Sequence, residues 1–285
     1  MNPIYNVNEV DNISFYCSTL TDSKGDRSFI YVLNMYDKYK DNTNNNVYIR
    51  IPLHLCVISR INDTDAFKML LNEAYLIITS EYSFNAKKAE LLNYFMFISS
   101  IVTPPRHSLL TLNLNYMNID FYFHSKRELP STITDTNINI LFSVLDVSKI
   151  IKLWICILQE RQIIIYGSRP FLLHAVIDAI TKLIFPFKYP YLIISCLPSN
   201  NLDLLDVPTI YIMGVLSSCI SIQQLQEKFS ETCIVDLETG RIVVKKVKRL
   251  PRDEEIFLKK RIQFAKNPEL FKAVERSMPY WGKKK

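Results

Sequence analysis

Glycine is scarce in this chain, and its scarcity excludes two large classes of nucleotide-binding enzyme. Only 5 of the 285 residues are glycine, and none stands in a G-x-G-x-x-G or G-x-x-x-x-G-K-[ST] motif. Both motifs need glycine because the backbone must approach a phosphate group closely. The sequence is therefore not that of a Rossmann-type dehydrogenase or a P-loop NTPase.

The sequence also lacks the features of membrane spans, secretion signals and metal sites. No apolar run reaches about 18 residues, and residues 1–11 contain neither the basic nor the apolar region of a signal peptide. The 4 histidines show no H-x-x-x-H spacing and the 6 cysteines show no C-x-x-C spacing. These patterns indicate no metal, no cofactor and no disulfide framework. The cysteines are expected to be buried, reduced thiols of a cytoplasmic protein.

Positive charge is concentrated at the C-terminal end. From Arg241 onward the chain has 15 Lys or Arg residues and 5 Asp or Glu residues, whereas the part before it has 19 and 23. The sequence therefore predicts weak contact of the basic C-terminal segment, from Lys245 on, with an anionic membrane. A solvated pair of helices with no membrane role is the alternative. No nucleic-acid partner is indicated.

The first half of the chain is patterned as an α+β module of antiparallel strands with two helices. The expected strands are Ile13–Leu20, Ser28–Met35, Val47–Ser59, Ser108–Leu114 and Ile119–His124. The expected helices are Asp63–Thr79, with Asp63 or Asp65 as its N-cap, and Asn85–Ser100. A polar segment over Ser131–Asn139 is expected to be a linker.

After this segment, helices alternate with short strands that are apolar throughout, as in a parallel sheet buried on both faces. The expected helices are Asp146–Glu160, Phe171–Ile184, Ile222–Phe229, Arg252–Ala265 and Pro268–Ser277. The expected strands are Gln162–Tyr166, Tyr191–Cys196 and Thr209–Gly214, followed by a hairpin of Cys233–Asp236 and Arg241–Val244.

Several segments, in order over about residues 14–250, resemble the DENN domain family. They are Ile51–Arg60, Ile140–Leu153, Leu158–Tyr166, Ile184–Tyr189, Leu197–Gly214, Val215–Ser218 and Val235–Gly240. The resemblance implies an α/β fold of two lobes. A longin-like antiparallel sheet with helices would occupy 1–130, and a Rossmann-like α/β lobe would occupy 140–250. Residues 251–285 would form a short basic helical segment in place of the family's larger downstream module.

The activity implied by the resemblance is guanine nucleotide exchange on a Rab-type small GTPase in membrane traffic. The nucleotide-free GTPase would be held in a groove between two lobes, without covalent catalysis, by a protein that is cytoplasmic and peripheral on vesicle membranes. One alternative is a non-catalytic adaptor that sequesters a small GTPase or pairs with a longin-fold partner. Another is a GTPase-activating protein supplying Arg60, Arg106 or Arg169.

The Leu197–Pro208 turn is the candidate partner-binding site, because loops at strand ends carry function in α/β sheets. Its polar residues are Ser199, Asn200, Asp203 and Asp206, and Ser217 and Ser218 at the end of the next strand are expected to share that edge. Capping of the turn is the alternative role of these side chains. No catalytic residue is assigned, and His174 is interpreted as a packed histidine rather than a general base.

Overall fold

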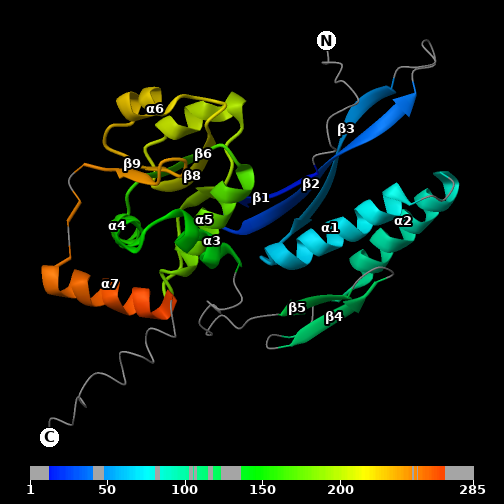
Figure 1. Ribbon diagram of the computed structural model, residues 1–285, viewed down its shortest axis with the longest axis horizontal. Helices are drawn as coiled ribbons and strands as arrows, with labels where there is room; N and C mark the ends of the chain where they lie inside the picture. The colour runs from blue at the N-terminus through cyan, green and yellow to red at the C-terminus, as the bar shows by residue number, and fades with distance from the viewer. Residues whose placement is uncertain are drawn as a thin grey trace, which may run out of the picture. The chain divides into compact units, whose positions relative to one another are not determined.

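The computed structural model describes residues 13–40, 48–80, 84–102, 105, 108–114, 118–122, 136–245, 247–248 and 250–266, drawn in colour in Figure 1. The chain divides into two compact units. Unit 1 comprises 1–131, 169–174 and 192–196, and unit 2 comprises 132–168, 175–191 and 197–285. Both units combine helices with strands, as the expected α/β class requires. The domain boundaries expected from the sequence stay a prediction.

Unit 1 contains an antiparallel sheet of β1 (Ser14–Thr21), β2 (Arg27–Lys40) and β3 (Tyr48–Ser59) in the order β1–β2–β3. The turn between β1 and β2 is closed by Asp22, whose Oδ1 accepts hydrogen bonds from the backbone nitrogens of Lys24 at 2.8 Å and Asp26 at 2.9 Å. Gly25 has φ +83, a conformation that glycine adopts without strain. The predicted hairpin and the strand that follows it are confirmed.

Two helices, α1 (Thr64–Thr79) and α2 (Phe84–Ser100), follow the sheet and contact each other. Asp63 is the N-cap of α1, because its Oδ1 accepts a hydrogen bond from the Ala66 nitrogen at 3.0 Å. The Tyr94 hydroxyl on α2 donates to the Leu70 carbonyl on α1 at 2.7 Å. A hairpin of β4 (Leu109–Asn113) and β5 (Asn118–Tyr122) completes this series, so the predicted order of elements is confirmed.

Aromatic rings from three elements pack at the centre of unit 1. The rings of Tyr31 on β2 and Phe67 on α1 stack at a centroid distance of 4.2 Å, and Phe121 on β5 meets Phe67 edge-on at 5.5 Å. The Tyr31 hydroxyl donates to the Ile61 carbonyl at 2.9 Å and accepts from the Asp63 nitrogen at 3.1 Å. The buried hydroxyl therefore has partners where the chain enters α1.

Unit 2 is built on parallel strands. β6 (Ile163–Gly167) pairs in parallel with β8 (Tyr211–Leu216) and β9 (Cys233–Asp236), while β10 (Arg241–Val243) pairs antiparallel with β9. Every residue of β6 is buried, and Ile163, Ile164 and Ile165 have no exposed surface. The parallel arrangement predicted from the apolar strands is confirmed.

The remaining helices are α3 (Thr136–Val144), α4 (Val147–Leu158), α5 (Pro170–Lys182), α6 (Ile222–Lys228) and α7 (Arg252–Lys266), of which α5 begins in unit 1 and ends in unit 2. Helix α3 corrects the linker expected over 131–139, because Thr136–Asn139 are helical. Asn137 is buried and its Nδ2 donates to Asp178 Oδ2 at 2.7 Å, which offsets the cost of burying its amide. Residues 131–135 and Pro268–Ser277 lie outside the described part.

The cysteines are only in part as expected. Cys17, Cys156 and Cys233 are buried, Cys196 and Cys219 are half-buried, and Cys56 is exposed on β3, which corrects the expectation that all are buried. Among the described residues, no group of three or more His, Cys, Asp or Glu side chains is placed to hold a metal ion. In the same part of the chain, no helix is both long enough and apolar enough to cross a membrane.

Candidate partner-binding site

The turn before β8 is a 3₁₀ helix, η1 (Ser199–Asp206), which the sequence patterns did not reveal. The Leu197 nitrogen, just before η1, donates to the Gly214 carbonyl of β8 at 2.8 Å. Within η1, Leu205 is buried, and the hydroxyl of buried Tyr211 donates to the Leu205 carbonyl at 2.9 Å. The turn is therefore anchored to β8 through its own backbone.

Gln162, directly before β6, holds the far end of the turn. Its Nε2 donates to the carbonyl oxygens of Val207 at 3.0 Å and Thr209 at 2.9 Å. One side-chain amide thus satisfies two carbonyls of the segment that leads into β8. Since both ends are held, the polar side chains Ser199, Asn200, Asp203 and Asp206, which are exposed, project from a fixed backbone.

Asp203 and Asp206 lie three residues apart in η1. In a 3₁₀ helix, side chains three residues apart eclipse one another, and the kink in η1 is at Asn201, before both carboxylates. Asp203 is exposed, and its carboxylate has no hydrogen bond or ion pair within the described chain. The two carboxylates therefore form a small acidic face on η1.

Asp206 forms an ion pair with a residue of α6. Its Oδ2 lies 2.6 Å from Nζ of Lys228, in the last turn of α6, and both side chains are about half exposed. Lys228 also lies with its Nζ 5.1 Å from the centroid of the Phe229 ring. Exposed pairs of this kind contribute roughly 0.2–1 kcal/mol, so an incoming cation can replace Lys228 at little cost.

Ser217 and Ser218 stay predicted members of the site. They follow the carboxyl end of β8, where the Ser217 nitrogen donates to the Gly167 carbonyl at 3.0 Å. Tyr211, which holds Leu205, starts β8 at its amino end. Six residues of extended strand correspond to roughly 20 Å, so the serines lie about one strand length from the amino end of β8, whose Tyr211 holds the Leu205 end of η1.

The carboxyl end of the parallel strands is occupied by a structural turn. Asp236 accepts hydrogen bonds from the nitrogens of Glu238 at 2.9 Å and Thr239 at 3.4 Å, and from the Thr239 hydroxyl at 2.6 Å. Burial raises the pKa of nearby Tyr166, and the negative charges of Glu238 and Asp236 raise it further. The hydrogen bonds to Asp236 stabilise the β9–β10 turn, in which Gly240 has φ +63.

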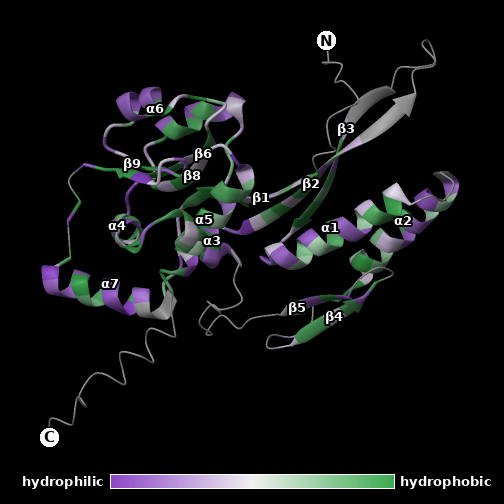
Figure 2. Cartoon of the chain, in the orientation of Figure 1, coloured by the Kyte–Doolittle hydropathy of each residue, from purple (hydrophilic) through white to green (hydrophobic). Residues whose placement is uncertain are grey.

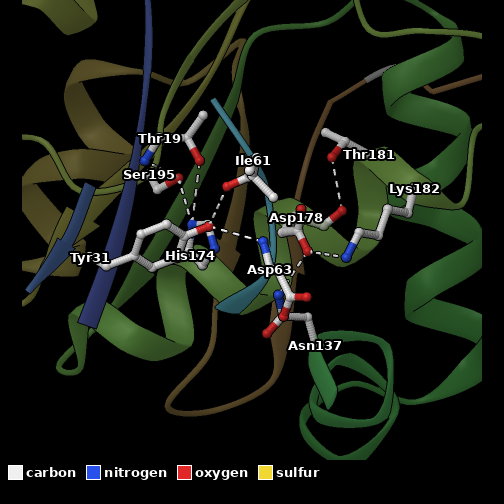
Figure 3. A network of polar contacts seen from close by, with 10 residues as sticks. All are labelled: Thr19, Tyr31, Ile61, Asp63, Asn137, His174, Asp178, Thr181, Lys182 and Ser195. Atoms are coloured by element: carbon white, nitrogen blue, oxygen red, sulfur yellow. Dashed lines mark hydrogen bonds and ion pairs between the residues drawn. The ribbon is translucent and has the colours of Figure 1, made fainter. Parts of the chain in front are cut away.

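His174 is buried in unit 1, as the packed-histidine interpretation predicts. Figure 3 shows its ring beside Thr19 on β1 and Ser195, which follows β7 (Leu192–Ile194). His174 Nδ1 lies 3.4 Å from Thr19 Oγ1 and 3.3 Å from Ser195 Oγ, and the Thr19 nitrogen donates to Ser195 Oγ at 3.2 Å. With no exposed surface, the His174 ring is closed to substrate and ties β1 to the segment after β7.

An exposed apolar face on α2 is a feature that sequence reasoning missed. Leu92 and Met96 are 59% and 60% exposed, and Phe95 between them is 37% exposed, whereas Tyr94 on the opposite face is buried. The segment is apolar nearly all round, so its sequence does not tell the buried face from the exposed one. Clustered exposed apolar side chains of this kind mark interaction surfaces on proteins.

Comparison with known proteins matches residues 50–240 to a family model described as the DENN (AEX-3) domain. The chain belongs to the DENN domain family. The matched range contains η1, β8 and the β9–β10 turn, and ends before α7.

Three relatives illustrate the likeness. Myotubularin-related protein 5 of Caenorhabditis elegans is 24% identical over 241 residues, which cover 84% of this chain and 13% of that protein. Human DENN domain-containing protein 2B is 28% identical over 152 residues, 53% of this chain and 12% of the relative. DENN domain-containing protein 1A of Xenopus laevis is 26% identical over 215 residues, which cover 73% of this chain and 20% of that protein. The chain thus matches a fifth or less of the length of each of these DENN relatives.

Proposed function

We propose that this DENN-family chain is a guanine nucleotide exchange factor for a Rab-type small GTPase. The observation that carries the proposal is the family match over 50–240, which runs from β3 to the β9–β10 turn. In this proposal unit 1 is the longin-like lobe and unit 2 the Rossmann-like lobe of the family. The protein acts in the cytoplasm, at the surface of the vesicle membranes on which Rab proteins work.

The proposed activity requires differential binding and no bond chemistry. A GTPase that holds its nucleotide with picomolar affinity gains about 16 kcal/mol from it. A protein that binds the nucleotide-free state more tightly than the loaded state shifts the population toward release of GDP. The acidic face of η1 suits this task, because carboxylates can accept charge-assisted hydrogen bonds from the GTPase lysine that otherwise holds a nucleotide phosphate.

Asp203 and Asp206 have different parts in this proposal. Asp203 is exposed and open to a cationic donor from the start. Asp206 becomes available when a GTPase cation takes the place of Lys228, an exchange of one ion pair for another. Ser199 and Asn200 add neutral hydrogen bonds at the beginning of η1, before its kink.

A binding measurement and a measurement of GDP release test the proposal. The full chain is passed over immobilised Rab proteins in nucleotide-free, GDP-loaded and GTP-loaded forms. Tighter binding to a nucleotide-free Rab, with faster GDP release from the same Rab, is expected. Preference for a GTP-loaded Rab without faster release would assign the chain to the adaptor class instead. Release of GDP from no member of a Rab panel would refute exchange on this class of GTPase.

A further inference from the structure

Helix α7 packs on α4 with one face and exposes apolar side chains on the other. Leu258 and Ile262 are half-buried, whereas Ile256 is 44% exposed and Phe257 is 56% exposed. Because a helix turns by about 100° per residue, Ile256 and Phe257 lie on the side away from Leu258 and Ile262. In Figure 2, hydrophobic and hydrophilic residues alternate along this helix.

Two cations stand beside these apolar side chains. Lys260 and Arg261 are exposed and lie four residues after Ile256 and Phe257, which places each cation next to one apolar group. The Arg261 guanidinium carbon lies 5.2 Å from the centroid of the Phe257 ring, within the range of a cation–π contact. Ile256, Phe257, Lys260 and Arg261 together are called the α7 face below.

The charge of α7 is ordered along its axis. Asp253, Glu254 and Glu255 occupy the first turn, where the helix dipole favours negative charge. Lys259, Lys260 and Arg261 follow one turn later, within a C-terminal segment in which 15 cations outnumber 5 acids. Along the exposed side of α7, the acidic first turn is therefore followed by Ile256 and Phe257 and then, one turn later, by Lys260 and Arg261.

We propose that the α7 face docks on a bilayer that contains anionic phospholipids. Exposed apolar side chains next to Lys and Arg are the pattern of helices that lie at a membrane interface, where the apolar groups enter the headgroup boundary. Each Lys or Arg near an anionic surface contributes about 1 kcal/mol of attraction. The segment from Arg241 onward, which contains α7, carries 15 cations and 5 acids, so its charge is complementary to an anionic lipid surface.

The α7 face lies outside the family match, which ends at residue 240, and the proposal is independent of nucleotide exchange. Two apolar side chains and two cations give weak, reversible attachment, comparable to that of a single lipid anchor. Such attachment would concentrate the protein at a membrane without holding it there permanently.

Vesicle sedimentation of the full chain tests the proposal. Vesicles of phosphatidylcholine are compared with vesicles in which about a third of the lipid is phosphatidylserine. Binding to the anionic vesicles only is expected, and binding should disappear at about 1 M salt, where the Debye length is about 3 Å. Equal binding to both kinds of vesicle, or to neither, would overturn the proposal.

Matched variants locate the surface. Lys260→Glu with Arg261→Glu should weaken vesicle affinity by at least about tenfold, and Ile256→Ala with Phe257→Ala should also weaken it by at least about tenfold. The control is Lys24→Glu with Lys68→Glu, two exposed lysines of the β1–β2 turn and α1, which changes the net charge equally. A control variant that loses as much affinity as the α7 variant would refute the location.

Light scattering measures whether the chain self-associates through the α7 face. A wild-type chain that ignores vesicles but self-associates, and loses self-association on Ile256→Ala with Phe257→Ala, would assign the α7 face to a second copy and overturn the lipid proposal. Thermal melts of all variants should match the wild type, since the four side chains are exposed.

Discussion

The carboxylate of Asp206 lies 2.6 Å from the ammonium of Lys228. This ion pair gives Asp206 a different environment from Asp203, although both carboxylates lie on the same turn. Asp206 is engaged within unit 2, whereas no described residue forms a hydrogen bond or ion pair with the Asp203 carboxylate. In the proposed exchange mechanism, Asp203 meets the GTPase first and Asp206 follows when Lys228 is displaced. Substitutions can distinguish the two steps.

Removal of both carboxylates should impair exchange without unfolding the protein. Asp203→Ala with Asp206→Ala is expected to slow catalysed GDP release by at least about tenfold, near 1.4 kcal/mol. The melting temperature should stay close to that of the wild type, because an exposed ion pair contributes little.

Lys228→Ala is the matched control, since it breaks the same ion pair but leaves Asp206 in place. It should exchange at the wild-type rate or faster. A double aspartate variant that melts early would indicate that the carboxylates stabilise the turn. One that melts normally and exchanges at full rate would place the GTPase contact elsewhere.

The serines at the carboxyl end of β8 should matter less than the sequence suggested. Ser217→Ala with Ser218→Ala removes hydroxyls about 20 Å from the amino end of β8 and is expected to change GDP release by less than about twofold. The backbone bond from Ser217 to Gly167 is kept in this variant. A loss as large as that of the aspartate variant would show that the partner contacts the carboxyl end.

Tyr211 should make stability fall at high pH. Burial raises its pKa from 10.0 to about 12, the Asp206 charge adds to this rise, and the Thr232 hydroxyl opposes it. The folded state thus holds the phenol proton more tightly than the unfolded state, so this stabilisation is complete below pH 10 and is lost as the pH rises from 10 to 12.

Tyr211→Phe should reduce the loss of stability at high pH, since only the contribution of Tyr211 is removed, and should cost about 1 kcal/mol at neutral pH through the lost bond to Leu205. Urea unfolding between neutral pH and pH 12 measures both effects. Tyr36→Phe, at an exposed tyrosine of β2, is the control. An alkaline loss of stability that is the same in Tyr211→Phe and the wild type would contradict the assignment to Tyr211.

Substitutions on the exposed face of α2 should change stability little, whereas a substitution on its buried face should lower stability. Leu92→Glu with Met96→Glu is expected to shift the free energy of unfolding by less than about 0.5 kcal/mol, because both side chains are exposed. Tyr94→Phe removes a buried bond to the Leu70 carbonyl and should cost about 1–2 kcal/mol. Chemical denaturation measures both, and a large loss in the glutamate variant would mean that the outward face is covered in solution.

Local patterns predicted the elements well where a single capping residue or a short apolar run determines the structure. Asp63 was a candidate N-cap from its place before an amphipathic run, and it caps α1. The apolar Ile163–Ile165 run predicted a strand buried in a parallel sheet, and β6 is that strand. The cap of α1 depends on a local hydrogen bond, and the apolar pattern of β6 requires burial on both faces of a sheet.

The features that escaped prediction depend on partners distant in sequence. Asn137 is helical and buried because Asp178, 41 residues away, accepts its amide. The pairing of Asp206 with Lys228 arises only when α6 returns toward the amino end of β8. Ser217 and Asp206 are close in sequence, yet β8 separates them, and the length of a strand cannot be inferred from the residue types at its ends.

Catalytic turnover in GDP release tests the central claim most directly. A Rab protein loaded with fluorescent GDP is mixed with excess GTP and the chain at about one molecule per hundred GTPase molecules. The account predicts complete release of GDP, with a rate proportional to the amount of chain, because an exchange factor is regenerated after each cycle. The account would be contradicted by GDP release that stops at one GDP per molecule of chain. It would also be contradicted if the chain did not accelerate GDP release from any Rab protein.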